Sequence, residues 1–537
     1  MRQGEWMIRR MWVLAFVGLL VASMGPVGDA LAQKTGGVLR IYTPDSPASM
    51  SPIEEATAFA VGPMMGVFNN LVLFDQNVKQ NSLQSIVPDL ASRWSWSENK
   101  LELIFPLRQG VKWHDGKPFT AKDVECTWNL VMEKSLEKLR VNPRSTHYRN
   151  LDRVTTNGDF EIIFHLKRPQ PAFLMLLAAG SSPVYPCHVP PETMRRHPIG
   201  TGPFRFVDYK PNQYIKLTRN PDYWKPGRPY LDAIEYTIIR NVGTAMLAFT
   251  ARSLDMTFPT QVAVPLIKDL KRQSPEAICE VTPSTINRHI IINRSVPPFD
   301  NPDVRRAMAL TIDRQAYIDI LSEGQGEIGT VLQPAPTGQW GMPPHLLKEL
   351  PGYSPDVEQN RQQARAIMER LGYGPTKRLM VKLTTRDLPV YRDPAVILLD
   401  QLKQIYFDGE LELVETALYF PKIRRKEFSI GLNLQTSGPD PDPTLDAFYG
   451  CGSNFNWDGY CNPEVDKLIE QQSIEGDEAR RKQLVWAIER KLADDAARPI
   501  IFHSNAATCW HPHVRGLTIM VNSIFNGYRH EDTWFDK

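Results

Sequence analysis

One glycine pattern in the chain could hold a dinucleotide. Gly324, Gly326 and Gly329 fit G-x-G-x-x-G, in which the glycines let the backbone approach a pyrophosphate. Such a loop must follow a strand and open a helix, whereas this one follows a predicted helix at 313–321 and continues into a segment ending in Pro334. We therefore interpret it as a helix stop followed by a loop. The sequence has no P-loop, no H-E-x-x-H and no G-x-S-x-G, so no motif for phosphate, zinc or nucleophilic chemistry is recognised.

The tightest histidine cluster is His511 and His513, separated by Pro512. The proline and the lack of a cysteine or carboxylate at ligand spacing argue against a metal site. We expect no metal, no cofactor and no enzymatic activity. Scattered carboxylates still leave room for a secreted hydrolase.

The first 32 residues are typical of a secretory signal peptide. Arg9 and Arg10 precede an apolar run at 11–24, and Ala30-Leu31-Ala32 provides a small-residue cleavage site. The run is shorter than the roughly 20 apolar residues of a spanning helix. The arginine pair also occurs in twin-arginine signals, but the residues after it fit that signal poorly, which favours the general secretory route. We predict a mature chain that begins at Gln33 and is located in the periplasm.

Six cysteines follow this segment, and the first of them is Cys126. No cysteine stands directly after the cleavage site, so we expect no lipid anchor. Export permits disulfides. Cys451 and Cys461 flank a short segment rich in Gly, Ser and Asn that can fold back on itself, which predicts a disulfide between them. For the other cysteines, which are Cys126, Cys187, Cys279 and Cys509, the sequence fixes no pairing.

The charge is nearly balanced, with a formal net of +2 at pH 7. Nucleic-acid binding requires a basic stripe, so we expect no nucleic-acid partner. The 505 residues after the signal segment exceed what one hydrophobic core usually supports. The mature protein should therefore have at least two lobes.

Short strands and helices alternate along the chain, which indicates an α/β fold. We expect strands at 38–42 and 215–217 and a hairpin at 153–166, where Asn157-Gly158 favours a tight turn with positive φ. Helix starts are marked by capping residues, which are Thr120 with Asp123, Asn301 before Pro302, and Asn462 before Pro463.

Several stretches of the chain together form a recognisable series. Val87 to Trp94 comes first, followed by Leu107 to Val124, L-R-Q-G-V-K-W-H-D-G-K-P-F-T-A-K-D-V. The later stretches are GTGPF at 200–204, RNPDYW at 219–224, NRSVPPFD at 293–300 and VRRAMALTID at 304–313. In this order the stretches resemble the bacterial extracellular solute-binding proteins of family 5, the peptide/nickel-binding family, and the segment from Leu107 to Val124 is close to the family signature.

The resemblance implies a two-lobed, class II-like periplasmic-binding-protein fold with an extra subdomain in the first lobe. Two crossovers would join the lobes, and a solute would be enclosed between them. The expected lobe I is 33–76 plus 198–280 plus 502–537, its subdomain is 77–197, and lobe II is 281–501.

In peptide-binding relatives an aspartate pairs with the free amine of the peptide. Aligned on Cys451, that position falls on Ser437, three residues before Asp440. Dipeptide binders also use a helix arginine for the carboxylate, but the helix around 395–399 has none. We therefore expect no binding of ordinary dipeptides, unless Asp440 substitutes for the missing charge.

Candidate ligand-binding residues near this segment are polar or aromatic: Ser437, Asp440, Trp340, Arg386, Tyr391 and Arg392. For both arginines a solvated surface position is an equally valid interpretation, and for Trp340 simple packing is.

The function implied by the resemblance is that of the periplasmic solute-binding component of an ABC importer. The small-molecule solute would be oligopeptide-like, opine-like or oligosaccharide-like, and the protein would work as a monomer that contacts the permease subunits in the inner membrane. The alternatives are a ligand sensor for a membrane receptor and a secreted hydrolase that depends on carboxylates.

Overall fold

The N-terminal strand of the described chain is the edge of a four-stranded sheet. The computed structural model describes residues 33–522 and 525–536. The strand order is β1-β10-β9-β8, with β1 parallel to β10 and the other pairs antiparallel. Ile215 and Leu217 alternate inward on β9, which confirms the strand predicted there. The bounds are β1 Val38–Thr43, β8 Phe204–Lys210, β9 Tyr214–Arg219 and β10 Ala233–Ile238.

A second four-stranded sheet lies in the segment between β1 and β8. Its order is β4-β5-β7-β6, and β6 and β7 form the predicted hairpin. The prediction of a tight turn with positive φ at Asn157-Gly158 was wrong. Of these two residues Gly158 has a positive φ of 68° and Asn157 does not. Asn157 N–H instead donates to the Glu161 carbonyl, so the loop is longer and only one residue must be left-handed. The bounds are β4 Ser95–Trp96, β5 Glu102–Pro106, β6 Leu151–Thr156 and β7 Glu161–Leu166.

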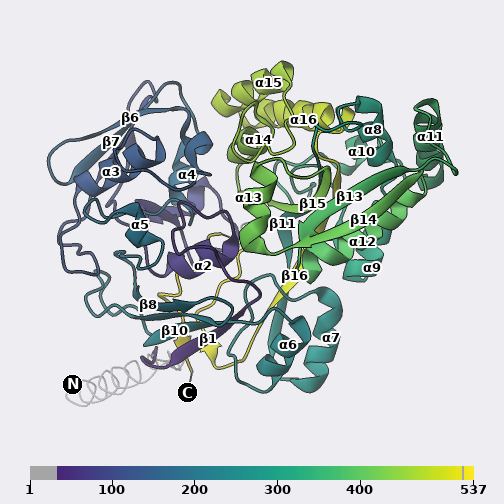
Figure 1. Ribbon diagram of the computed structural model, residues 1–537. Coiled ribbons are helices and arrows are strands. Elements are labelled where there is room, and N and C mark those ends of the chain that lie inside the picture. Colours follow the sequence, from purple (N-terminus) through teal and green to yellow (C-terminus); the bar gives the residue numbers. More distant parts are fainter. Residues whose placement is uncertain (1–32, 523–524, 537) are drawn as a thin grey trace, which may run out of the picture.

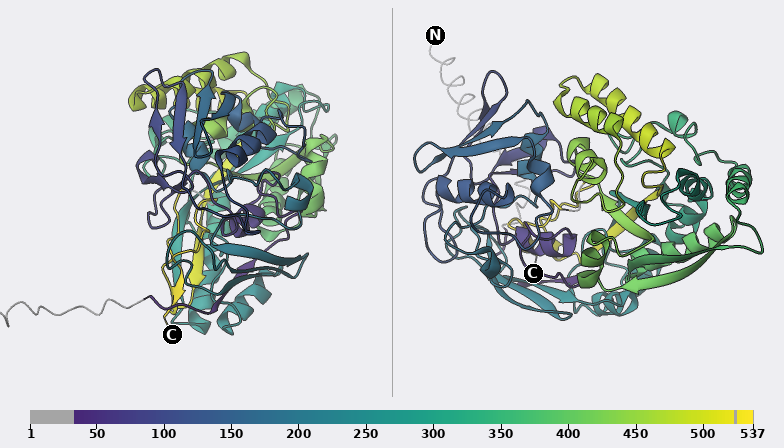
Figure 2. Two further views of the ribbon diagram at one scale, coloured as in Figure 1. Left: turned by 90° about the vertical axis from the view of Figure 1, so that its left-hand side faces the viewer. Right: turned by 45° about the horizontal axis from the view of Figure 1, so that its top comes forward.

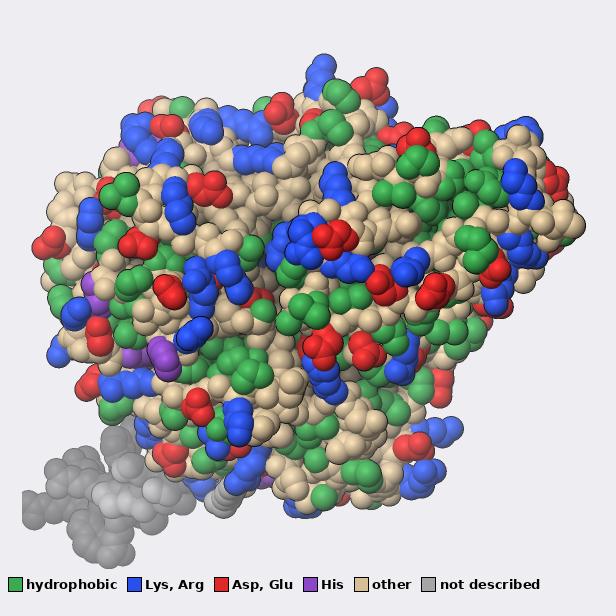
Figure 3. All heavy atoms as spheres, in the orientation of Figure 1, with side chains coloured by type: hydrophobic (Ala, Val, Ile, Leu, Met, Phe, Trp, Pro, Cys, Tyr) green, Lys and Arg blue, Asp and Glu red, His purple; other side chains and the backbone are tan. Residues whose placement is uncertain are grey.

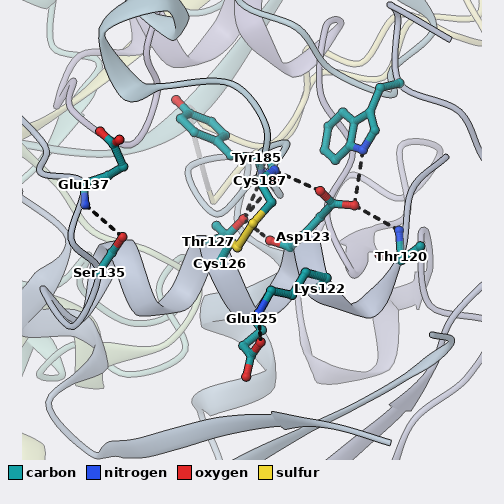
Figure 4. Close-up of a disulfide and its surroundings, with 11 residues drawn as sticks. Thr120, Lys122, Asp123, Glu125, Cys126, Thr127, Ser135, Glu137, Tyr185 and Cys187 are labelled. Carbon is teal, nitrogen blue, oxygen red and sulfur yellow. Dashed lines mark hydrogen bonds and ion pairs between the residues drawn. A yellow bond between two sulfur atoms is a disulfide. The ribbon is translucent and has the colours of Figure 1, made fainter. Parts of the chain in front are cut away.

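Helix α3 (Ala121–Val131) packs on this sheet and begins as predicted, with the Thr120 backbone N–H donating to Asp123 Oδ2 at 2.9 Å. Figure 4 shows that the Asp123 carboxylate accepts further hydrogen bonds. Asp123 also accepts from the Trp113 indole at 3.3 Å and from the Cys187 backbone at 2.9 Å. A disulfide between Cys126 and Cys187 then ties α3 to the loop before α5 (Pro191–Met194).

The largest sheet has six strands in the order β12-β16-β11-β15-β13-β14. One core of buried side chains is shared by this sheet and by α8 (Pro302–Leu310), α9 (Arg314–Ser322), α11 (Val357–Arg370) and α12 (Pro389–Lys403). The strands are β11 Ile278–Ile292, β12 Gly326–Glu327, β13 Leu379–Arg386, β14 Phe407–Val414, β15 Ile430–Thr436 and β16 Ile500–Trp510.

Strands β11 and β16 are much longer than the others and run antiparallel to one another through the middle of the molecule (Figure 1). At one end Trp510 and Ala507 of β16 bridge to Met256 and Val262 of the N-terminal half. At the other end both strands belong to the six-stranded sheet. They are the two connections between the lobes, and the Cys279–Cys509 disulfide joins them near the first end.

The buried side chains separate into a core around the first two sheets and further cores around the large sheet, as expected of two lobes. Figure 2 shows the two lobes facing each other. The C-terminal strand pair, β17 (Val514–Arg515) and β18 (Trp534–Phe535), lies beside the first lobe. The predicted limits at residues 281 and 501 fall inside β11 and β16. The predicted lobe ranges stay predictions.

The remaining helices complete the lobes. Asn301 caps α8 through Asp303 N–H at 2.9 Å, and Asn462 caps α15 through Glu464 N–H at 3.0 Å, as predicted. The bounds are α2 Ala58–Met65, α4 Phe173–Ala178, α6 Val242–Thr250, α7 Val264–Gln273, α10 Pro344–Leu347, α13 Thr416–Arg424, α14 Pro441–Tyr449, α15 Pro463–Ile474 and α16 Glu478–Asp494.

The glycine pattern at 324–329 follows α9 and contains the two-residue strand β12, which pairs with β16. It opens no helix, so the interpretation as a helix stop is confirmed, although a short strand stands where only loop was expected. Within the described residues, no helix combines the length and apolar character needed to cross a bilayer, and no group of three or more potential metal ligands occurs.

The surface mixes both signs of charge. Figure 3 shows acidic and basic side chains interspersed over the face presented there, in keeping with the small net charge of the chain. The predicted signal peptide at 1–32 lies outside the described residues.

We expect the three disulfides to contribute unequally to stability. A cross-link removes more entropy from the unfolded chain when its loop is longer. Cys279–Cys509 closes 230 residues and should contribute about 5 kcal/mol, against about 3 kcal/mol for Cys451–Cys461, which closes 10. Double alanine variants of each pair, compared by thermal unfolding, test this order. Equal losses would contradict it, as would free alkylation of the native cysteines.

Candidate functional site

A cavity of about 600 Å³ lies between the two lobes. The first lobe supplies part of its wall, including Thr57, Phe59 and Arg144, and the second lobe supplies Arg288, Arg386 and Trp457. This volume is in the range of small-molecule sites. Because both lobes contribute side chains, a bound molecule would contact both.

Arg386 is the last residue of β13 and is buried at the junction of the lobes, with 2% of its surface exposed. Its Nη2 donates to Asp45 Oδ2 at 2.7 Å, and Asp45 follows β1 of the other lobe. Nε donates to Thr416 Oγ1 at 3.0 Å, and the Thr416 hydroxyl itself donates to Asp45. This buried pair therefore joins the two lobes through charge-assisted hydrogen bonds.

Other contacts also cross between the lobes, one of them buried and the others exposed. Gln170 Nε2 donates to Asp442 Oδ2 at 2.6 Å, and Asn454 Nδ2 donates to the Asn142 carbonyl at 2.7 Å. An exposed ion pair links Arg240 to Glu415 at 3.2 Å. Together with Asp45–Arg386 they describe a closed arrangement of the two lobes.

Comparison with known proteins matches this architecture. The profile of bacterial extracellular solute-binding proteins, family 5 (middle), covers residues 85–456. The chain belongs to this family. It is 27% identical over 425 residues to the oligopeptide-binding protein AppA of Bacillus subtilis (strain 168), spanning 74% of this chain and 75% of that one.

Solved family structures share the whole fold. AppA of Bacillus subtilis, in complex with a nonapeptide, superposes with a TM-score of 0.83 at 22% identity, over 94% of this chain and 100% of that one. AgaA from A. tumefaciens R10, in complex with agropinic acid, superposes with a TM-score of 0.81 at 20% identity, over 93% and 99%. The two-lobed fold predicted from the sequence is confirmed.

For this family 5 protein, two of the predicted site residues act together in the cavity wall. Tyr391 stands in the first turn of α12, and its hydroxyl accepts from Arg386 Nη1 at 2.5 Å. Both residues line the cavity. Arg392, one residue further, is outside the lining: it is 43% exposed and pairs with Asp393 at 3.2 Å. A one-residue step on a helix turns the side chain by about 100°, which separates the neighbours.

Asp440 lines the cavity but is already paired. It caps α14 through Asp442 N–H, and both of its oxygens accept from Arg481, at 2.6 and 2.8 Å. Burial alone would lower the pKa of Arg481, but the Asp440 carboxylate outweighs this and raises it. The Asp440 carboxylate, considered above as a substitute for the missing amine-binding charge, is therefore neutralised within the protein.

The two other predicted residues lie outside the cavity lining. Ser437 is buried, and its hydroxyl donates to the Val331 carbonyl at 3.3 Å. Trp340 presents its ring to the Arg481 guanidinium, 4.7 Å from the ring centre, and its indole N–H donates to the Pro439 carbonyl. Trp340 thus supports the ion pair of Asp440 from behind.

Several lining residues were missed by sequence reasoning. Arg288 lies in the middle of β11, and Trp457 lies within the loop closed by the Cys451–Cys461 disulfide, beside Phe420 and Phe455. A signal for Arg288 existed, because Asn287-Arg288-His289 stands between Ile286 and the apolar run at 290–292. The aromatic cluster gave no comparable signal, since aromatic residues in a sequence usually indicate core.

We expect Asp45→Asn to open the lobes of the unliganded protein. Removing one charge of a buried pair costs roughly 3–5 kcal/mol, because Arg386 remains buried without a counter-charge. The control Glu415→Gln breaks an exposed pair, worth about 1 kcal/mol or less. Small-angle scattering should show a larger radius of gyration for Asp45→Asn alone. Unchanged dimensions in both variants would contradict a closing role for this pair.

We also expect Asp440→Asn to lower the free energy of unfolding by roughly 3–5 kcal/mol, since it strands Arg481 inside the protein. Asp393→Asn removes the other carboxylate of the lining, which is 49% exposed and should matter little. Denaturant unfolding of both variants compares the two. A small effect of Asp440→Asn would mean that its carboxylate is free for a ligand after all.

Proposed function

We propose that this protein captures a small solute in the periplasm, encloses it between its lobes and delivers it to the permease of an ABC importer. The observation that carries the proposal is the cavity, which is walled by side chains from both lobes. A molecule that contacts both walls stabilises the closed form, and the closed form is what a transporter can recognise.

Two observations bear on the class of solute: the ligands with which relatives are described, and the charged residues that line the cavity. Relatives are described with peptides and with agropinic acid, and the cavity of about 600 Å³ is in the range of small-molecule sites, so oligopeptide-like, opine-like and oligosaccharide-like compounds are the candidate solutes. Ordinary dipeptides fit less well. Among the described lining residues the carboxylates are those of Asp393 and Asp440. Asp440 is held by Arg481 and Asp393 is half-exposed beside Arg392, so neither supplies a buried, unpaired charge for a peptide amine.

The same charge pairs favour binding over hydrolysis. Catalysis by two carboxylates requires groups free to exchange protons with a substrate. Asp440 instead accepts two bonds from Arg481. We further propose that the mature protein begins at Gln33, carries no lipid anchor and acts as a monomer.

Thermal unfolding with a panel of solutes tests this function. At 100 times its dissociation constant, a true ligand should add about 2.7 kcal/mol of stability. The panel should contain dipeptides, longer peptides, opines and neutral oligosaccharides, with mass spectrometry of molecules released from the protein purified from its native source. We expect stabilisation by at least one class other than dipeptides. No stabilisation by any class and no released molecule would refute solute capture.

A further inference from the structure

Arg288 occupies the floor of the cavity. Strand alternation places it on the same side of β11 as Ile286, and their partners on β15 are Leu434 and Thr436. All four residues line the cavity. The pairing of β11 with β15 therefore fixes a cationic side chain in an otherwise largely apolar wall.

The guanidinium of Arg288 has little to hold it. The residue is 8% exposed, and within the described part of the chain its Nε and Nη1 have no hydrogen-bond partner. Its nearest ring contact is Phe502, 4.6 Å from the guanidinium carbon. Burial lowers the pKa of Arg288 to about 10, against an opposing effect of the Tyr391 phenol, so the side chain stays protonated at neutral pH. A buried charge without a counter-charge is costly and calls for a partner.

Arg386 and the two lining carboxylates have charged partners: Arg386 pairs with Asp45, and the carboxylates pair with arginines, as described above. Arg144 has only a neutral acceptor, because its Nη2 donates to the Glu55 carbonyl at 2.7 Å, and its Nε has no hydrogen-bond partner among the described residues. Burial and Arg144 lower the pKa of His147 to about 3, which leaves it neutral. The uncompensated charge of the cavity is therefore positive, and it is carried by Arg288 together with Arg144.

We propose that Arg288 binds a carboxylate of the captured solute, and that the protein therefore selects acidic solutes over their neutral counterparts. The inference rests on the proposed function, because it assigns the ligand chemistry of that same cavity. A guanidinium presents parallel N–H groups that match the two oxygens of a carboxylate. A solute carboxylate beside the guanidinium would supply the missing counter-charge.

Matched acid and neutral compounds provide the test. One series consists of N-acetylated tripeptides to pentapeptides with a free C-terminal carboxylate, together with N-carboxyalkyl amino acids. The other consists of the same peptides as C-terminal amides and the same amino acids as methyl esters. Binding is measured by calorimetry and thermal shift for the wild type, for Arg288→Gln and for the control Arg306→Gln. Arg306 is exposed on α8 of the same lobe, so the control removes an equal charge outside the cavity.

We expect acids to bind wild type and Arg306→Gln equally, and the neutral forms to bind both more weakly by about 10- to 100-fold. Arg288→Gln should lose that preference. The acid-over-neutral preference of the wild type stands as a separate readout if the variant folds poorly.

Two results would overturn the inference while leaving solute capture intact: neutral compounds or neutral oligosaccharides binding as well as acids, or undiminished acid binding by folded Arg288→Gln. Binding of nothing in either series or in the solute panel above would overturn both proposals.

Discussion

The hydrogen-bonded pairing of β11 with β16 sets the position of everything else in this molecule. Each strand begins or ends in the first lobe and reaches into the six-stranded sheet of the second. Ile278 lies opposite Trp510 near the first lobe and Arg288 lies opposite Phe502 at the cavity, with a shift of register between Pro283 and Asn287. A slip of one residue would turn Arg288 from the cavity to the opposite face of the sheet. The Cys279–Cys509 bond lies in the same ladder, on the first-lobe side of the shift, and holds the pairing there covalently.

Charge pairing in the cavity wall separates residues that hold the protein together from residues free to meet a solute. Arg386 and Asp440 both line the cavity, as ligand-binding groups would. Each forms a buried ion pair with another side chain, Arg386 with Asp45 and Asp440 with Arg481. Trp340 belongs to the same structural set, because its ring packs on the Arg481 guanidinium. The low polarity of the interior explains the division, since a buried charge is tolerated where a partner is close.

Local features of this chain were predictable and long-range ones were not. The cap of α8 at Asn301 and the start of α3 at Thr120 depend on residues within three positions, and both were predicted from the sequence. The two-lobed fold was predicted from the resemblance to family 5, not from local patterns in the sequence.

The role of Asp440 could not be predicted, because its partner Arg481 lies 41 residues away in the sequence. No pattern in either segment indicates that the two side chains meet. The turn at Asn157 failed for a smaller reason. The dipeptide favours a two-residue loop, but the strand register at Thr156 and Ile162 requires a longer one.

The contacts that join the lobes have a further consequence for transport. Asp45–Arg386 and Gln170–Asp442 involve protein atoms on both sides, so they stabilise the closed form whether or not a solute is enclosed. A fixed share of empty molecules therefore adopts the delivery-competent shape, and the share rises with the strength of these contacts. Such empty molecules compete with loaded ones for the permease. The strength of these inter-lobe contacts thus sets how often empty molecules occupy the permease, and a loaded molecule must compete with them.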